Sequence, residues 1–128
     1  MNQTRFNNYW QAAGWLGVGL IAYLSLTPAP PQINIEKGDK FGHLAAYGLV
    51  TLWFAQLYTG LRQRILLAVG MVVLGIAMEY AQRATGYRTF DIADMIADGL
   101  GVAIGLLAAP PRLPNLLSWA EKRITRIF

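Results

Sequence analysis

Four long stretches of this sequence carry almost no charge, and their lengths limit the fold more than any other feature. They cover residues 10–26, 41–61, 65–82 and 92–109. A helix needs about 20 mostly apolar residues to cross the hydrocarbon core of a bilayer. The third stretch reaches that length only by including polar residues at its end, and the fourth begins with polar residues. The pattern predicts an all-α integral membrane bundle of four transmembrane helices.

The composition agrees with one membrane domain over residues 1–128. Charged residues make up 14% of the chain, against roughly 25% in soluble domains, which nearly excludes a soluble enzyme. The absence of cysteine excludes disulfides, thiolate zinc sites, iron–sulfur clusters and cysteine nucleophiles. A net charge of +4 would suggest nucleic acid as the partner of a soluble protein. In a membrane protein the same excess records topology, so we expect no nucleic acid.

The first stretch has some features of a secretory signal, namely Arg5, an apolar run and small residues near Ala29. Its apolar run is longer than the usual signal core of about 7–15 residues. Trp10, Trp15 and Tyr23 also suit a membrane helix with aromatic anchors at the interfaces. We therefore expect this segment to be retained as the first transmembrane helix.

Basic residues predict the orientation, because cytoplasmic loops of membrane proteins carry an excess of Lys and Arg. In a four-span arrangement one side holds seven of them and a net charge of +6, while the other holds four and a net charge of −2. The first side is expected to be cytoplasmic, which places both termini in the cytoplasm. Its basic residues are Arg5, Arg62, Arg64, Arg112, Lys122, Arg123 and Arg126.

Residues 112–128 mix apolar and basic side chains. This composition suits an amphipathic helix that lies along the inner leaflet. It equally suits a basic tail that is attracted to anionic lipid. Neither structure would carry chemistry.

Polar side chains that are costly inside a membrane gather at one level, the outer ends of the second, third and fourth stretches. Within each stretch, spacings of three, four and seven residues place them on a common helical face. Ionisable groups inside a membrane are functional candidates by default. We call this set the outer polar cluster; its members are Lys40, His43, Tyr47, Glu79, Gln82, Arg88, Asp91, Asp94 and Asp98.

Closely spaced carboxylates repel one another, so at least one is expected to hold a proton near neutral pH, as a general acid or base must. The candidate catalytic residues are Glu79, Asp94, Asp98 and His43. The candidate substrate-binding residues are Lys40, Arg88, Tyr47, Gln82 and Asp91, of which the two basic ones suit an anionic headgroup.

A metal site is not expected in the outer polar cluster. The sequence has neither the H-E-x-x-H spacing nor an EF-hand loop, and the nearby basic residues can neutralise the acids instead. It also lacks a glycine-rich phosphate loop after a strand and a G-x-S-x-G elbow, so nucleotide hydrolysis and serine acyl transfer have no support. We expect no cofactor.

The members of the cluster also have plainer interpretations. Charged groups near a helix end reach the headgroups at modest cost, so Lys40, Asp91 and Arg88 are each typical of surface residues. Glu79 and Asp98 lie farther inside apolar runs, where a carboxylate costs about 2.5–3.5 kcal/mol. These two acids need partners or water.

The order of these motifs resembles the VanZ-like family of small bacterial membrane proteins. The resemblance implies a compact bundle of four or five transmembrane helices, in a family named for a protein that raises resistance to teicoplanin. Asp98 is a departure, because the family usually has an asparagine there. The resemblance covers residues 36–109 and rests on Asp39-Lys40-Phe41-Gly42-His43, Tyr47, Glu79, Gln82, Arg88, Asp91, Asp94, Asp98, Gly101 and Gly105.

By resemblance, we expect a cell-envelope protein of the bacterial inner membrane that contributes to tolerance of glycopeptide antibiotics or of envelope stress. It would bind or modify a membrane lipid or an anionic lipid-linked precursor through the outer polar cluster. An enzyme, a binding module, a purely structural bundle and a small transporter all remain open, although a transporter with four spans and no inverted repeat would need a dimer. The face of Gly101 and Gly105 permits close helix packing and is a candidate contact for a homo-oligomer.

Overall fold

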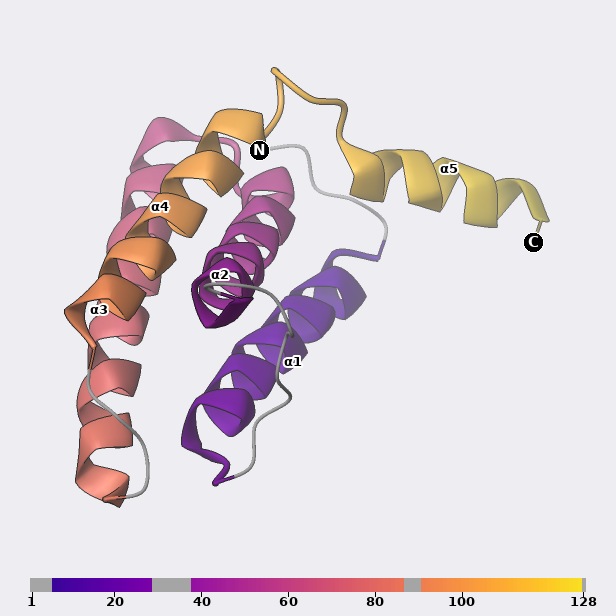
Figure 1. Ribbon diagram of the computed structural model, residues 1–128. Coiled ribbons are helices and arrows are strands. Elements are labelled where there is room, and N and C mark those ends of the chain that lie inside the picture. The colour runs from indigo at the N-terminus through magenta and orange to yellow at the C-terminus, as the bar shows by residue number, and fades with distance from the viewer. Residues whose placement is uncertain (1–5, 29–37, 87–90, 128) are drawn as a thin grey trace.

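Five helices form the described part of the chain in a computed structural model (Figure 1). The structure describes residues 6–28, 38–86 and 91–127, with only the backbone described at residues 38 and 39. No strand occurs in these ranges, so the all-α class is confirmed. The helices are α1 (Asn7–Leu26), α2 (Gly38–Leu57), α3 (Leu61–Thr85), α4 (Ile92–Ala108) and α5 (Leu116–Ile127).

Each of the first four helices contains most of one predicted stretch, and the bounds differ most at the turn between α2 and α3. The sequence pattern continues the second stretch to residue 61, whereas α2 ends at Leu57. Arg64 donates hydrogen bonds to the carbonyl oxygens of Ala55, at 2.9 Å, and Tyr58, at 3.1 Å. Carbonyls at the end of a helix lack partners within it, so Arg64 stabilises the end of α2 at this point.

α2 and α4 pack backbone to backbone through glycines. A β-carbon at Gly105 would lie 2.6 Å from the carbonyl oxygen of Gly48, and one at Gly101 would overlap the carbonyl oxygen of Leu44. The face of Gly101 and Gly105 therefore contacts α2 of the same chain. A homo-oligomer stays a prediction, and it would need a different surface.

α1 packs on α2 through a glycine and two tryptophans. A β-carbon at Gly14 would lie 2.6 Å from Cζ of Phe54, so only glycine leaves room for this ring. The rings of Trp10 and Trp53 meet edge to face, with their centroids 5.9 Å apart. Trp53 Nε1 also donates a hydrogen bond of 2.8 Å to the carbonyl oxygen of Trp10. These contacts fix α1 against the α2 side of the bundle.

Several acidic side chains are buried in this bundle while many large apolar side chains are exposed, which is the reverse of the arrangement in a water-soluble bundle. Glu79 is 1% exposed and Asp98 is 2% exposed, whereas Leu16 is 75% exposed and Leu61 is 78% exposed. In soluble proteins Asp and Glu are almost never fully buried unless they are paired. The buried polar and charged residues are Ser25, Thr51, Gln56, Glu79, Gln82, Asp94, Asp98 and Glu121.

α3 has the length and composition of a membrane-crossing helix, and among the described helices it alone meets both criteria. It contains 25 residues, and most of its apolar part is exposed at the surface of the protein. A core helix of a soluble protein would bury that apolar surface. The exposed apolar face of α3 is therefore typical of contact with lipid.

α5 extends away from the other helices in Figure 1 but is fastened to α1 and α2. The carboxylate of Glu121 accepts hydrogen bonds from the backbone N–H of Phe6, at 2.6 Å, and from Trp10 Nε1, at 2.8 Å. The side-chain oxygen of Gln56 accepts a hydrogen bond of 3.1 Å from the backbone N–H of Leu117. The sequence left a helix and a basic tail open for this segment, and the structure contains the helix.

Gly101→Val is expected to destabilise the protein by about 1–3 kcal/mol, the usual cost of overpacking, because its side chain would overlap the backbone of α2. Gly99→Ala is the matched control on α4, since a β-carbon there meets no atom within 4 Å. The control is expected to be neutral or slightly stabilising. Thermal unfolding in detergent, followed by tryptophan fluorescence, measures both variants. Equal effects of the two substitutions would contradict the glycine contact.

Candidate functional site

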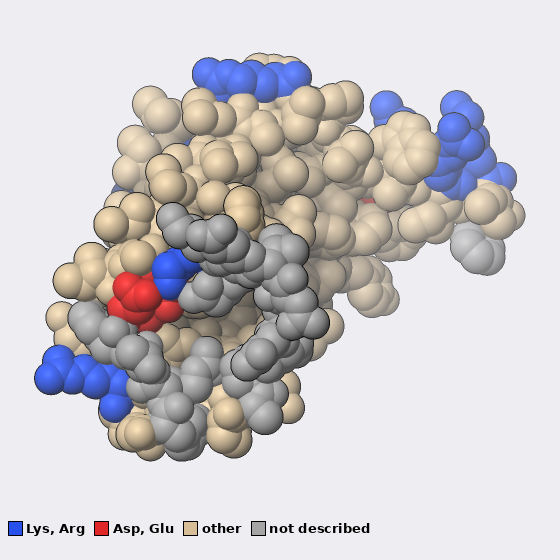
Figure 2. All heavy atoms as spheres, viewed as in Figure 1, with Lys and Arg blue, Asp and Glu red and all other residues tan. Residues whose placement is uncertain are grey.

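The outer polar cluster forms where three helix ends meet: the beginning of α2, the end of α3 and the beginning of α4. Charged side chains also gather at this end of the molecule on the face shown in Figure 2, and much of the surface between the two ends is uncharged. The glycine contact between α2 and α4 places Lys40 and His43 directly opposite the acids of α4. The site thus depends on the packing of these two helices.

Lys40 bridges two carboxylates of α4. Its Nζ lies 2.7 Å from Oδ2 of Asp91 and 2.8 Å from Oδ1 of Asp94. Asp91 also caps α4, because its Oδ1 accepts a hydrogen bond of 2.9 Å from the N–H of Ala93. The hydrogen bond from Lys40 and that from the Ala93 N–H both lower the pKa of Asp91. The ammonium predicted to contact a headgroup is therefore already held by two acids.

His43 is held by Asp98 and faces Asp94. Nδ1 of His43 lies 2.8 Å from Oδ1 of Asp98, and Nε2 lies 3.8 Å from Oδ2 of Asp94. A carboxylate that accepts a hydrogen bond from one ring nitrogen fixes the tautomer and orients the other nitrogen for proton transfer. Here Asp98 holds Nδ1 of His43, which leaves Nε2 on the side of Asp94.

Glu79 joins α3 to the beginning of α4. Its Oε1 accepts a hydrogen bond of 3.2 Å from the backbone N–H of Asp91. Its carboxyl group also interacts electrostatically with Asp94 and His43. Glu79 therefore adds a third acid to the cluster around His43, beside Asp94 and Asp98.

Gly75 makes room for Asp98, and this role is not visible in the sequence pattern. A β-carbon at Gly75 would lie 3.0 Å from Oδ2 and 3.2 Å from Cβ of Asp98. Gly75 precedes Glu79 by one helical turn, so both face α4 from the same side of α3. The signal that would have pointed to it is this spacing, a glycine four residues before a buried acid.

Two buried hydroxyl groups of α2 lie one and two helical turns beyond His43, toward the middle of the bundle. Tyr47 is 2% exposed and Thr51 is fully buried. Among the described residues, neither hydroxyl has a hydrogen-bond partner. Leaving a buried hydroxyl without a partner costs about 1–3 kcal/mol. Tyr47 interacts electrostatically with Asp98 and Glu79, so its hydroxyl belongs to the cluster. Thr51 was not predicted from the sequence, because a threonine in an apolar run is common in membrane helices.

The structure brings eight of the nine predicted cluster residues to one end of the bundle, with Gln82 buried on α3 one turn beyond Glu79. Arg88 lies outside the described residues. Within the described parts of the chain, no three His, Asp or Glu side chains are placed to hold a metal ion. The chemistry that these groups can perform is proton transfer, between Glu79, Asp94 and His43.

Lys40→Met is expected to raise the pKa of Asp91 toward the usual value near 3.9, because the ammonium that lowers it is removed. In the wild type the Lys40–Asp91 pair is complete above that usual value and is lost as the pH falls through the lowered pKa of Asp91. Carbon-13 NMR titration of the Asp91 carboxyl group measures the shift. Lys122→Met, an exposed change on α5, is the control and should leave this pKa unchanged. An unchanged pKa in Lys40→Met would contradict the ion pair.

Comparison with known proteins agrees with the motif order. The VanZ/LLP1 family model matches residues 2–115. The chain is also 35% identical over 89 residues to "Uncharacterized protein C11E3.10" of Schizosaccharomyces pombe, which covers 67% of this chain and 53% of the relative. The chain therefore spans about half the length of that relative. No solved structure gives a significant match. With most of its length matched by one family model, this chain belongs to the VanZ/LLP1 family.

Proposed function

We propose that this protein is a multi-pass membrane protein whose first four helices cross a bacterial inner membrane. α1 and α2 contain 20 residues each and α4 contains 17. At 1.5 Å per residue these lengths give about 26–30 Å, close to the hydrocarbon core of a bilayer. The reversed polarity of the bundle supports the proposal, because the polar groups of α2 and α4 face other helices. A criterion based on length and mean hydropathy selects α3 alone. It counts the polar residues of α2 and α4 against these helices, although those residues face other helices and not the lipid.

Charge supports an orientation with the outer polar cluster on the outer side. The end opposite the cluster carries six described basic residues, against two at the cluster end. Cytoplasmic segments are the ones enriched in Lys and Arg. The hydrogen bonds of Glu121 to Phe6 and Trp10 also keep α5 and the beginning of α1 at the same end. Both termini are then cytoplasmic.

The function that the geometry supports best is proton transfer on the polar part of an envelope lipid or lipid-linked precursor. The observation that carries it is the His43–Asp98 pair, at 2.8 Å, with Oδ2 of Asp94 lying 3.8 Å from the other ring nitrogen of His43. His43 is the acid–base residue, and Asp98 positions it. The Tyr47 hydroxyl is buried one turn deeper than His43 and lacks a described partner, so it supplies a hydrogen bond to a polar group that enters the cluster beside His43.

A lipid substrate is favoured over a peptidoglycan-specific one by the kind of relative found. The relative from Schizosaccharomyces pombe is a fungal protein, and fungi make no peptidoglycan. If that relative and this chain act on the same kind of molecule, it is one that both membranes contain. Changes in glycopeptide tolerance would then follow from a changed membrane lipid.

A structural role is the second candidate, and the contacts of Lys40 favour it. Its ammonium satisfies Asp91 and Asp94 together, as in an ion-pair network that holds α2 to α4. Removing Lys40 would leave the buried carboxylate of Asp94 without its ion-pair partner and destabilise the protein. A structural network would tolerate charge-preserving changes such as Lys40→Arg and Asp94→Glu.

His43→Gln is expected to abolish the activity while the protein still inserts, because acid–base groups contribute about 10²–10⁴-fold to rates. The variant and the wild type are expressed at matched membrane levels in a teicoplanin-sensitive Gram-positive host. Extracted lipids are compared by mass spectrometry, and susceptibility to teicoplanin and vancomycin is measured in parallel. The wild type should change the abundance of at least one lipid class.

Ala45→Ser is the matched control, since this exposed α2 residue lies two positions from His43 and faces away from the cluster. It should behave as the wild type. A wild type that inserts but alters neither lipids nor susceptibility would overturn the proposed activity. If His43→Gln lowered only the thermal stability and kept the lipid change, the structural role would be the correct one.

A further inference from the structure

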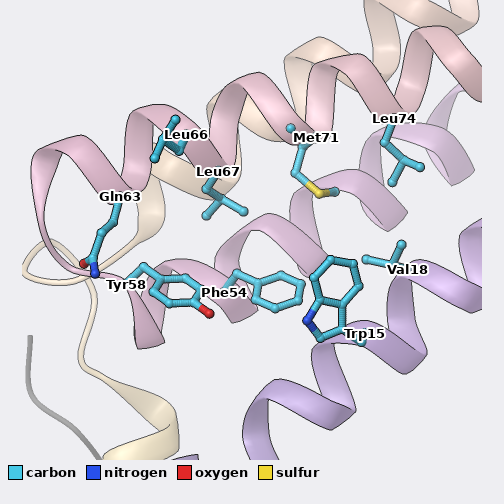
Figure 3. A pocket seen from close by; sticks show the side chains of 10 residues that line it. Trp15, Val18, Phe54, Tyr58, Gln63, Leu66, Leu67, Met71 and Leu74 are labelled. Atoms are coloured by element: carbon cyan, nitrogen blue, oxygen red, sulfur yellow. The ribbon is translucent and has the colours of Figure 1, made fainter.

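A second site is suggested by an apolar pocket in the half of the bundle away from the outer polar cluster. Its volume is about 470 Å³, and α1, α2 and α3 each contribute to its walls. Small-molecule sites usually measure about 300–1,000 Å³ and are mostly apolar. Figure 3 shows Leu66, Leu67, Met71 and Leu74 of α3 along one side, facing aromatic side chains of the other helices.

The pocket opens on the flank of the bundle. Two of its lining residues, Trp15 and Leu66, are 64% and 61% exposed. Phe54 and Met71, at 5% and 4% exposed, form its inner wall. In a membrane this opening faces hydrocarbon, so a ligand can enter sideways from the bilayer.

The pocket has the length of one lipid leaflet. Its α3 wall runs from Gln63 to Leu74, which is about 16 Å of helix at 1.5 Å per residue. This is close to half of the roughly 30 Å hydrocarbon core. An alkyl chain of a lipid in one leaflet spans this same distance, whereas a transmembrane helix of a partner would run past the pocket at both ends.

The polar end of the pocket lies at the turn between α2 and α3. Tyr58 and Gln63 line it there, as Figure 3 shows, and the exposed Arg62 is the neighbour of Gln63. Arg64 already donates its hydrogen bonds to carbonyl oxygens of α2. Arg62 is exposed and is the other basic residue of this turn, so it is available to an anionic group at this end of the pocket.

We propose that this pocket holds one alkyl chain of an anionic phospholipid from the leaflet at the Arg62 end, with the lipid phosphate near Arg62. Along α3 the basic residue Arg62 comes first and the apolar lining from Leu66 to Leu74 follows. An anionic phospholipid has the same order, with a charged phosphate followed by an alkyl chain. The inference rests on the proposed membrane insertion but not on the acid–base role of His43. The bound lipid serves as a fixed part of the bundle, filling the space between α1 and α3.

The test uses the full chain in phosphatidylglycerol nanodiscs that contain a trace of the same lipid with a diazirine at the end of one acyl chain. After irradiation, peptide mapping is expected to place the label beside Trp15, Phe54 and Met71. Gly70→Phe, which adds a ring at a pocket position where a β-carbon meets nothing within 4 Å, should reduce this labelling. The expected reduction is about tenfold, equal to the loss of two buried methylene groups.

Gly99→Phe is the matched control on α4, another position where a β-carbon meets no atom within 4 Å and one that does not line the pocket. Its labelling should equal that of the wild type. Arg62→Gln should reduce the preference for phosphatidylglycerol over phosphatidylcholine by about two- to fivefold, as for a partly exposed ion pair. Arg112→Gln removes the same charge elsewhere and should retain the preference.

Label spread evenly over the apolar flank, or unchanged in Gly70→Phe, would overturn the proposal. So would a cross-link between two copies of the chain that Gly70→Phe abolishes, because a second protein would then occupy the pocket. Flotation of the membranes measures insertion alone, so it distinguishes the proposed membrane embedding from the proposed lipid pocket. A wild type that fails to insert refutes membrane embedding and the lipid pocket together, whereas insertion without local labelling refutes only the pocket.

Discussion

The close contact between α2 and α4 is the constraint on which the rest of the structure depends. Gly48, Gly101 and Gly105 bring the two backbones together without intervening side chains. At this separation the short side chains of aspartates on α4 reach Lys40 and His43 on α2. A wider spacing would admit water or lipid between the charges and leave them without partners. Helices in lipid gain little from burying apolar groups against one another, so such close packing is also a main source of their association.

The burial of charge in this bundle is tolerable because nearly every charged group in the cluster has a specific partner. Lys40 neutralises two carboxylates, His43 contacts a third, and Glu79 accepts a hydrogen bond from the backbone N–H of Asp91. Paired and hydrogen-bonded groups avoid the cost of isolated ions in a medium of low dielectric constant. The contacts that make the buried charges tolerable are therefore the same contacts that join the ends of α2, α3 and α4.

The positions of the helices could be predicted from the sequence, because charges and prolines interrupt the apolar stretches at the ends of α1 to α4. The gathering of the outer polar cluster also followed, since successive helices that cross in opposite directions place alternate ends together. The individual partners could not be predicted. Spacing assigns Asp94 and Asp98 to one face of α4, but the rotation of that face toward His43 depends on the glycine contact. The space that Gly75 leaves for Asp98 and the burial of Thr51 depend on the same tertiary packing.

The hydrogen bonds of Glu121 have a consequence for how the protein is made. α1 leaves the ribosome before the other helices, yet the acceptor for the Phe6 N–H and the Trp10 indole lies in α5, which is synthesised after them. The first helix can form early, but the contacts of its N-terminal end are completed only when translation has passed residue 121. The fold therefore closes around the beginning of α1 only after the other helices have been synthesised.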